Sequence, residues 1–221
     1  MQKIKHMTKH PLWQDEYFLF LMQIYEKKPV GMKALYSRPM VNLSLELHIP
    51  PHCLYEAMFF MRRSELPSIR RLWKKYGNNE NKLKRDVERL RKLNGYGDAD
   101  VFYEGVDLKK SFEKMFEPVC DGSKLTPVML IMILNTYFRL TPNTMVVETP
   151  EIKDMAKKLD ISPEMIVEVM EVFQQCDPYL NRTSIETSIY KEVCTDIWDQ
   201  YGNENPEKLS STAAQLEELF K

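Results

Sequence analysis

The stretch DMAKKLDISPEMIVEVM, at residues 154–170, reads as one helix, a tight turn and a second helix. Apolar residues at helical spacing run up to Leu159, and Ile161 supplies an apolar side chain for the turn. Ser162 and Pro163 then provide the residue types that favour a helix N-cap and a first helical position. The stretch therefore predicts two helices joined by a short, defined turn.

A second stretch, NLSLELHIPPHCLYEAM, lies 112 positions earlier, at residues 42–58, and has a similar order of apolar and turn-forming residues. Residues 16–58 align with residues 128–170 without a gap. The identical pairs in this alignment are Tyr25/Tyr137, Leu47/Leu159, Ile49/Ile161, Pro51/Pro163, Glu56/Glu168 and Met58/Met170. Because self-similarity at a fixed spacing is the sequence signature of repeated modules, the alignment favours a duplicated helical unit.

A shared motif extends the similarity toward the end of each copy. LWKKYGN (72–78) and IWDQYGN (197–203) place Trp, Tyr, Gly and Asn at the same spacing, and an amphipathic stretch follows each. We predict an all-α protein with two copies of one helical module, at residues 11–94 and 124–221. Each copy is expected to hold a three-helix core of helix-turn-helix type and one or two further helices. Two unrelated helical segments remain the alternative.

Between the copies, residues 95–123 are expected to form a linker. Its Gly and Asp clusters bracket one predicted amphipathic helix at about 107–116, where the apolar positions follow helical spacing. The first copy has a basic character and the second an acidic one, so the linker joins two regions of opposite charge.

The order of elements in each copy resembles that of tandem helix-turn-helix proteins. The resemblance rests on AKKLDISPEMIVEVM (156–170), in which a small residue, a Leu and an apolar turn residue precede a Ser-Pro cap. Together with the apolar segment at 127–140, the motif is similar to the three-helix core of winged-helix proteins. Copy one has Pro50-Pro51 in place of the Ser-Pro cap, and no β-hairpin pattern follows either copy. The resemblance implies a regulator-like role in nucleic-acid binding.

Composition places the chain among ordinary globular proteins, with 43% hydrophobic and 29% charged residues. The 4 cysteines are scattered without a CxxC pair, a pattern that favours reduced thiols in a cytoplasmic protein. The apolar run near the N-terminus contains Asp15, Glu16 and Gln23, which disfavours a signal peptide. The segment at 127–140 is too short to cross a bilayer, so no membrane association is expected.

Charge is divided unevenly along the chain. Residues 62–92 contain 12 Lys and Arg against 4 Asp and Glu, whereas residues 124–221 contain 9 against 16. Cations at helical spacing could hold a phosphate backbone; the alternative is a solvated face, or one that docks on an acidic protein surface. The nucleic-acid-binding candidates are Arg63, Arg70, Arg71, Lys74, Lys75, Lys82, Arg85, Arg89 and Lys92.

The second helix of each motif has an outward stripe that differs between the copies. In copy two the stripe carries Glu164, Glu168 and Glu171, which would repel phosphates. In copy one it carries His52, Glu56, Phe59 and Arg63, and an exposed Phe favours contact with protein. The candidates for contact with a protein partner or with a second copy of the chain are His52, Phe59, Glu164, Glu168 and Glu171.

The sequence contains no catalytic signature, so we expect no enzymatic activity. His48, His52 and Cys53 form the only cluster of metal-ligand types, and Cys53 aligns with Met165 on the side expected to face the core. No metal and no cofactor are therefore expected. The leading hypothesis is a cytoplasmic, non-enzymatic binding protein that takes nucleic acid through the basic face of copy one. The competing hypothesis is a protein-interaction adaptor or scaffold without a nucleic-acid role.

Overall fold

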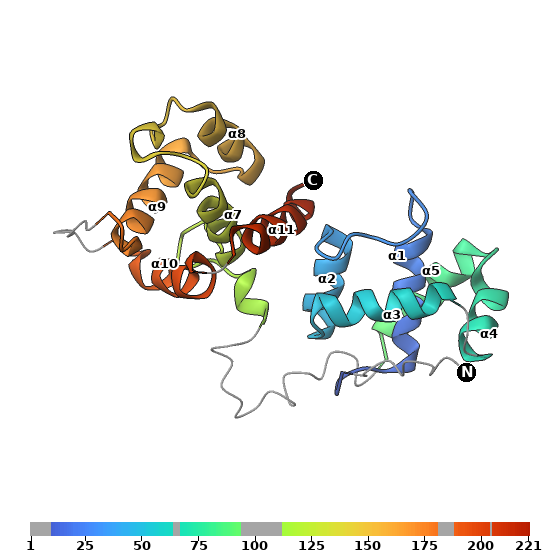
Figure 1. Cartoon of the computed structure of the whole chain (residues 1–221). Coiled ribbons are helices and arrows are strands. Elements are labelled where there is room, and N and C mark those ends of the chain that lie inside the picture. The colour runs from blue at the N-terminus through green and yellow to red at the C-terminus, as the bar shows by residue number, and fades with distance from the viewer. Residues whose placement is uncertain (1–9, 64–66, 94–111, 181–187, 204) are drawn as a thin grey trace, which may run out of the picture. The chain divides into compact units, whose positions relative to one another are not determined.

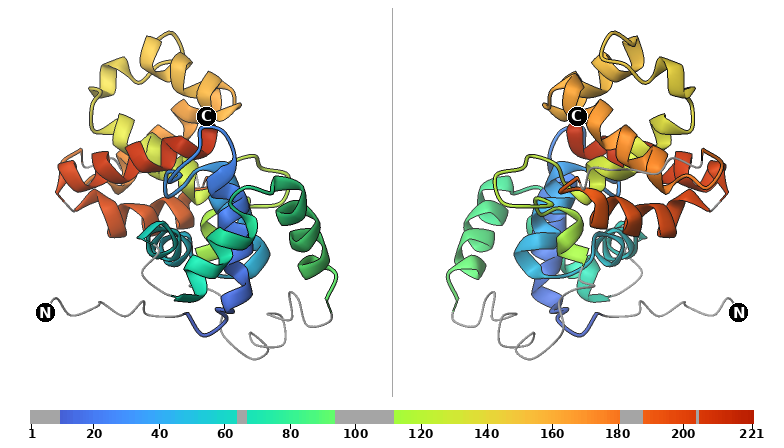
Figure 2. Two further views of the ribbon diagram at one scale, coloured as in Figure 1. Left: turned by 90° about the vertical axis from the view of Figure 1, so that its right-hand side faces the viewer. Right: turned by 90° about the vertical axis from the view of Figure 1, so that its left-hand side faces the viewer.

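The structure is a computed structural model that describes residues 10–63, 67–93, 112–180, 188–203 and 205–221. In these residues the chain forms helices joined by loops and no strand, so the predicted all-α class is confirmed (Figures 1 and 2). The chain divides into two compact units, Met1–Leu108 and Lys109–Lys221.

The first unit is arranged around α1, which contacts α2, α3 and α5 (Figure 1). This helix is central because most of its residues are apolar, and Phe18, Phe20, Leu21, Met22 and Ile24 are buried. The elements described in this unit are the 3-10 helix η1 (Asp15–Tyr17), α1 (Phe18–Glu26), α2 (Arg38–Leu47), α3 (Pro51–Arg63), α4 (Pro67–Tyr76) and α5 (Glu80–Arg91).

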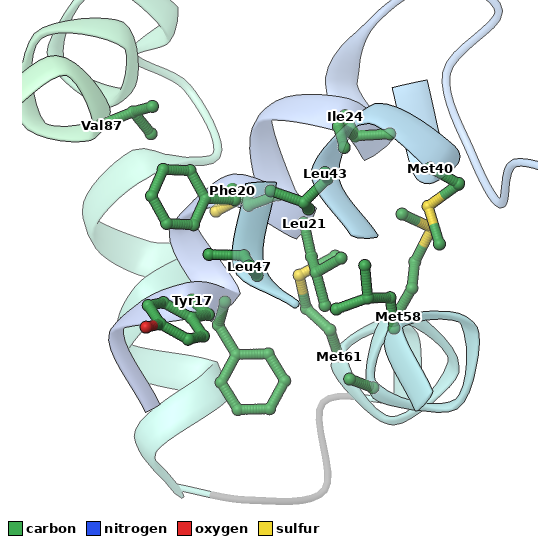
Figure 3. Packing of buried hydrophobic residues seen from close by; sticks show 14 of the residues in the cluster. Tyr17, Phe20, Leu21, Ile24, Met40, Leu43, Leu47, Met58, Met61 and Val87 are labelled. Carbon is green, nitrogen blue, oxygen red and sulfur yellow. The ribbon is translucent and has the colours of Figure 1, made fainter. Parts of the chain in front are cut away.

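The core of the first unit joins these helices through aliphatic and sulfur-containing side chains. Figure 3 shows Leu21 of α1 near Leu47 of α2 and Met61 of α3, and all three are at most 4% exposed. Phe20 extends from the other side of α1 toward Val87 of α5. Each such side chain contributes about 1.5–3 kcal/mol by leaving water, so α1 holds the unit together.

The second unit is arranged around α7, which contacts α8, α9, α10 and α11. The expected buried helix at 127–140 corresponds to α7, whose helical part ends at Tyr137 and whose apolar residues are buried over nearly its whole length. The elements described in this unit are η3 (Phe112–Met115), α7 (Pro127–Tyr137), η4 (Pro142–Thr144), α8 (Pro150–Leu159), α9 (Pro163–Cys176), α10 (Lys191–Ile197), the π-helical η5 (Trp198–Gly202), α11 (Pro206–Leu216) and η6 (Glu217–Phe220).

The turns between α2 and α3 and between α8 and α9 have the same backbone geometry. α2 ends at His48, with φ 53° and ψ 36°, and α8 ends at Asp160, with φ 55° and ψ 44°. Both residues lie in the left-handed region, which ends a helix abruptly and lets the chain reverse within a few residues. The N–H group of the following isoleucine donates back to the preceding helix at 3.1 Å in each case, from Ile49 and from Ile161.

The two helices that follow these turns begin differently. At α9 the Ser162 Oγ accepts from the Met165 N–H at 3.3 Å, which is the N-cap predicted from the sequence. At α3 no serine is present, and the Pro50 carbonyl accepts from the N–H of Cys53 at 3.0 Å. A backbone carbonyl therefore caps the start of α3, whereas a side chain caps the start of α9.

An aromatic pair ties the later helices of each unit to its central helix. The rings of Tyr25 and Trp73 lie 5.5 Å apart at 79°, and those of Tyr137 and Trp198 lie 5.8 Å apart at 77°. Both pairs are edge-to-face, the arrangement that aromatic quadrupoles prefer. The Trp73 indole N–H also donates to the Met61 carbonyl at 3.0 Å, which fixes α4 to the end of α3.

The expected linker helix at 107–116 lies largely outside the described residues. Its described part contributes to η3, a single 3-10 turn that contacts α7. The amphipathic stretch expected after LWKKYGN corresponds to α5, and Leu93 lies at apolar spacing from Leu90 just beyond it. Leu93 is 60% exposed, because α5 ends at Arg91 and the helical spacing no longer applies to it.

Candidate nucleic-acid interface

Helices α4 and α5 bury a narrow apolar stripe and present cations to solvent. Ile69 and Tyr76 of α4 are buried, as are Leu83, Val87 and Leu90 of α5. The remaining faces carry the predicted basic residues, all exposed except Lys82, which is half-buried. We call the following residues the basic surface: Arg70, Arg71, Lys74, Lys75, Lys82, Arg85, Arg89 and Lys92.

Tyr76 connects the cations of α4 with those of α5. Its ring is 4% exposed and lies 4.8 Å from the Lys75 Nζ and 5.7 Å from the Lys82 Nζ, measured to the ring centroid. Both distances fall within the range of cation–π attraction. The Tyr76 hydroxyl donates to the Asp86 Oδ2 at 3.0 Å. One tyrosine at the end of α4 thus contacts an anion and a cation of α5.

Asp86 is the carboxylate at the centre of this group. The hydrogen bond from Tyr76 holds the pKa of Asp86 below its ordinary value, and the charges of the neighbouring cations act in the same direction. Arg85 and Arg89 approach its Oδ1 at 3.7 and 3.6 Å. The Tyr76 cluster, defined as Tyr76, Asp86, Lys75, Lys82, Arg85 and Arg89, therefore gathers more positive than negative charge.

Part of the basic surface faces acidic residues of the same unit. Arg71 and Lys75 line a cavity of about 400 Å³ together with Asp15 and Glu16, which begin the turn before α1. The carboxylates reduce the positive potential along this side of α4. The cations on the α5 side of the Tyr76 cluster are then the stronger candidates for an external anion.

The outward face of α3 is aromatic and ends in arginine. His52 is exposed, Tyr55 is 37% exposed and Phe59 is 41% exposed. The Arg63 guanidinium carbon lies 4.9 Å from the Phe59 ring centroid. Sequence reasoning found His52, Phe59 and Arg63 but missed Tyr55, although its spacing of four residues from Phe59 places both on one side of a helix.

Cys53 lies between this outward face and the core. It is half-buried and packs against the core cluster, and its Sγ lies 3.3 Å from the His52 Nε2. Burial raises the pKa of the Cys53 thiol, and the Glu56 charge adds to that effect. The thiol is therefore protonated near neutral pH, which suits packing better than metal binding.

The outward face of α9 is acidic, as the sequence indicates. Glu164, Glu168 and Glu171 are exposed, while Ile166 and Phe173 are buried. Met165, which was expected to face the core, is half-buried. In the aligned stretches Glu164 and Glu171 of the second unit correspond to His52 and Phe59 of the first, while Glu168 corresponds to the exposed Glu56.

In the part of the chain that the structure describes, no three His, Cys, Asp or Glu side chains gather as they would around a metal ion. Cys194 is fully buried, and burial together with the nearby Cys176 raises its pKa to about 12, so it is a poor nucleophile. Over the same described ranges, no helix has the length and apolar character needed to span a bilayer.

Comparison of the chain with protein families, curated proteins and solved structures finds no match of any of the three kinds. The candidate site is therefore defined only by the residues and the geometry of this chain. The most developed of them is the basic surface, in which two helices present cations around a buried tyrosine.

Proposed function

We propose that this chain is a cytoplasmic, non-enzymatic protein that binds nucleic acid through the basic surface of its first unit. The observation that carries the proposal is the Tyr76 cluster, where cations from two helices are held close together around one carboxylate. Like charges repel, so cations gathered on an exposed surface favour a polyanionic ligand. Phosphate contacts of this kind supply most of the affinity in sequence-independent binding.

The spacing of the cations supports contact with successive phosphates. Arg70 and Lys74 are one helical turn apart on α4, as are Arg85 and Arg89 on α5. Four residues of α-helix advance about 6 Å, on the order of the axial distance between every second phosphate of one DNA strand. Each helix can then follow a strand over more than one phosphate group.

The position of α3 is consistent with this mode of binding. It follows a short turn after α2, in the order that the helix-turn-helix resemblance implies for a groove-facing helix. Its exposed Tyr55 and Phe59 offer flat surfaces to bases or sugars. Both helices expose one glutamate at equivalent positions, Glu56 and Glu168, but α9 adds Glu164 and Glu171, which would face phosphates with like charge. The first unit is therefore proposed to bind, and the second is not.

We also propose that the two units derive from one duplicated module. The left-handed residues His48 and Asp160 support this, because they stand at equivalent positions of the aligned stretches. The edge-to-face pairs Tyr25–Trp73 and Tyr137–Trp198 support it as well. On this proposal the core of the module was kept while its outward charge diverged.

The test is binding of the full chain to a fluorescent DNA duplex of mixed sequence at 50 and 200 mM salt. For four phosphate contacts the affinity should fall about 100-fold between the two conditions, because counterion release scales with the number of contacts. The variant Lys74→Gln/Lys75→Gln/Arg85→Gln/Arg89→Gln should reduce the slope of log affinity against log salt by about three to four.

A matched control removes the same number of cations from the second unit, at Lys153, Lys157, Lys191 and Lys208, all of which are exposed. Its net charge equals that of the first variant, so a difference between the two reports location and not overall charge. Equal losses in both variants, or no retention of DNA at 50 mM salt, would remove the proposal.

The second candidate function is a protein-interaction adaptor, which the exposed aromatics of α3 favour. Tyr55, Phe59 and Arg63 are residue types that dominate protein interfaces, and they stand at successive turns of one helix. Tyr55→Ser/Phe59→Ser should abolish self-association in analytical ultracentrifugation if this face binds a second copy. The nucleic-acid proposal expects the same variant to stay monomeric and to lose only part of its DNA affinity.

A further inference from the structure

The first unit contains a second polar cavity that the basic surface does not use. It has a volume of about 490 Å³ and is bounded by residues of α1, α2 and α5. The volume falls within the range of pockets that hold small organic ligands. The lining residues are Phe20, Gln23, Ile24, Lys27, Arg38, Pro39, Asn42, Leu43, Glu46 and Arg91.

The polar residues of this cavity come from two helical stripes. Arg38, Asn42 and Glu46 are spaced by four residues on α2, and Gln23 and Lys27 have the same spacing at the end of α1. Residues four apart lie above one another on a helix, so each stripe forms one wall.

The base of the cavity is apolar. Phe20, Ile24 and Leu43, which are labelled in Figure 3, are at most 7% exposed and belong to the core of the unit. Because these side chains are so little exposed, the surface that a ligand meets is made mainly by the wall residues, whose aliphatic stems and polar ends both line the cavity.

Arg91 is held in place at one side of the cavity. Its Nε and Nη2 donate to the two carboxylate oxygens of Glu46 at 2.6 and 3.0 Å, and its guanidinium carbon lies 5.0 Å from the Phe20 ring centroid. A bidentate pair that also stacks on a ring restricts the guanidinium to one orientation. The Arg91 guanidinium is therefore held in its orientation without a ligand.

The charge of the lining is positive. Glu46 offsets Arg91, and Lys27 and Arg38 add two further positive charges. Close by, the Lys33 Nζ donates to the carbonyls of Lys27 and Pro29. Burial lowers the pKa of Lys33, and the charge of Lys27 lowers it further.

We propose that this cavity binds the phosphate monoester of a small organic molecule, with a nucleoside monophosphate as the type of ligand that fits. Lys27 and Arg38 supply the charge for the phosphate, and the Gln23 and Asn42 amides can each donate and accept hydrogen bonds with the organic body. This site goes beyond the proposed nucleic-acid function, since it uses α1, α2 and Arg91 and none of the basic surface.

The experiment titrates the full chain with AMP, ribose 5-phosphate, inorganic phosphate and adenosine, followed by calorimetry. We expect one saturable site for AMP, with an affinity at least tenfold higher than for adenosine, because charge-assisted hydrogen bonds to phosphate are the strongest available contacts. Ribose 5-phosphate should bind more tightly than inorganic phosphate, because its sugar hydroxyls can also form hydrogen bonds with the Gln23 and Asn42 amides.

The variant Arg38→Gln should weaken AMP binding about tenfold or more, and it removes an exposed side chain, so the fold should survive. The matched control is Lys84→Gln, an exposed cation of α5 outside the cavity, which should bind AMP like the unaltered chain. Unchanged melting curves for both variants show that any loss is local.

Two sources of the phosphate are separated by competition. If a 5′-phosphorylated oligonucleotide displaces AMP and its 5′-hydroxyl form does not, the ligand is the phosphorylated end of a strand. If neither form displaces AMP, the ligand is a free small molecule. The inference is overturned if AMP shows no saturation at about 1 mM. It is also overturned if adenosine or the 5′-hydroxyl strand competes equally well, or if Arg38→Gln binds AMP normally. DNA binding by the basic surface can persist or vanish independently of these results.

Discussion

Helices α3 and α9 follow turns of nearly the same shape but differ in the side chains that they expose. His48 and Asp160 adopt left-handed conformations within a few degrees of each other, and each is followed by a helix after two further residues. Both outward faces carry a glutamate at equivalent positions, Glu56 and Glu168, but α3 adds His52 and Phe59 where α9 adds Glu164 and Glu171. Backbone geometry and outward chemistry have therefore been set by different residues, and the first does not predict the second.

The two tryptophan anchors differ in how deeply they are enclosed. Trp198 is 5% exposed and lies within 6.3 Å of the rings of Tyr137, Phe138 and Phe173, measured between centroids. Trp73 is half-buried and pairs with Tyr25, and its indole N–H is bonded to Met61. The second unit should thus depend more on its tryptophan than the first does.

The largest expected effect tests this difference. Trp198→Ala should lower the free energy of unfolding by about 3–5 kcal/mol, because it leaves a cavity among three aromatic rings. Trp73→Ala should cost about 2–3 kcal/mol, since less area is buried but a hydrogen bond is lost. Urea unfolding followed by circular dichroism gives both values. Equal losses would mean that enclosure does not distinguish the two anchors.

The glycine after each tryptophan gives an effect of intermediate size. A Cβ on Gly202 would lie 2.8 Å from the Trp198 ring, and one on Gly77 would lie 2.7 Å from the Trp73 carbonyl oxygen. Each Gly→Ala change should destabilise its unit by about 1–3 kcal/mol, because something must move to relieve the contact.

The two glycines are separated by repeating the change without the indole. Gly202→Ala should cost much less in the Trp198→Ala background, because the atoms that it meets are gone. Gly77→Ala should keep its cost in the Trp73→Ala background, because the obstacle there is backbone. A double-mutant cycle measures the two coupling energies, and coupling at Gly77 as large as at Gly202 would contradict this assignment.

The smallest expected effect concerns the left-handed residues. Asp160→Gly should stabilise the second unit by about 0.5 kcal/mol, since glycine adopts positive φ without the steric cost of a Cβ. The ion pair that it loses, between Lys124 and Asp160 at 3.2 Å, is solvent-exposed and contributes little. His48→Gly should gain less, because His48 is half-buried and makes other contacts.

Thermal unfolding of the unaltered chain, of Asp160→Gly and of His48→Gly checks this prediction, with Asp160→Ala as the control. Alanine keeps the Cβ but loses the polar side chain that tolerates the left-handed region, so its midpoint should fall. A rise for alanine as large as for glycine would show that backbone conformation is not the cause.

The positions of the helices were largely predictable because they follow from local rules. The LDISPE sequence contains an apolar helix end, a turn residue and a cap, and the structure places the end of α8 and the start of α9 there. The basic faces of α4 and α5 could be read from helical spacing for the same reason. Lys82 departs from the pattern because the Tyr76 ring, from another helix, covers part of it.

The assembled parts of the candidate sites could not be predicted in this way. The bond from Tyr76 to Asp86 joins two helices, and the pair formed by Glu46 and Arg91 joins residues 45 positions apart. Periodicity shows which side of a helix is outward, but it does not show which residue of another helix lies opposite. The 490 Å³ cavity depends on three helices at once and left no local signal in the sequence.

The bidentate ion pair of Arg91 with Glu46 joins the last turn of α5 to the last turn of α2. A shortened version of the chain that keeps only the first unit would have to extend at least through Arg91. Ending it at Leu90 would remove the ion pair between α5 and α2 and one lining residue of the neighbouring cavity, while the hydrophobic core would keep all its residues.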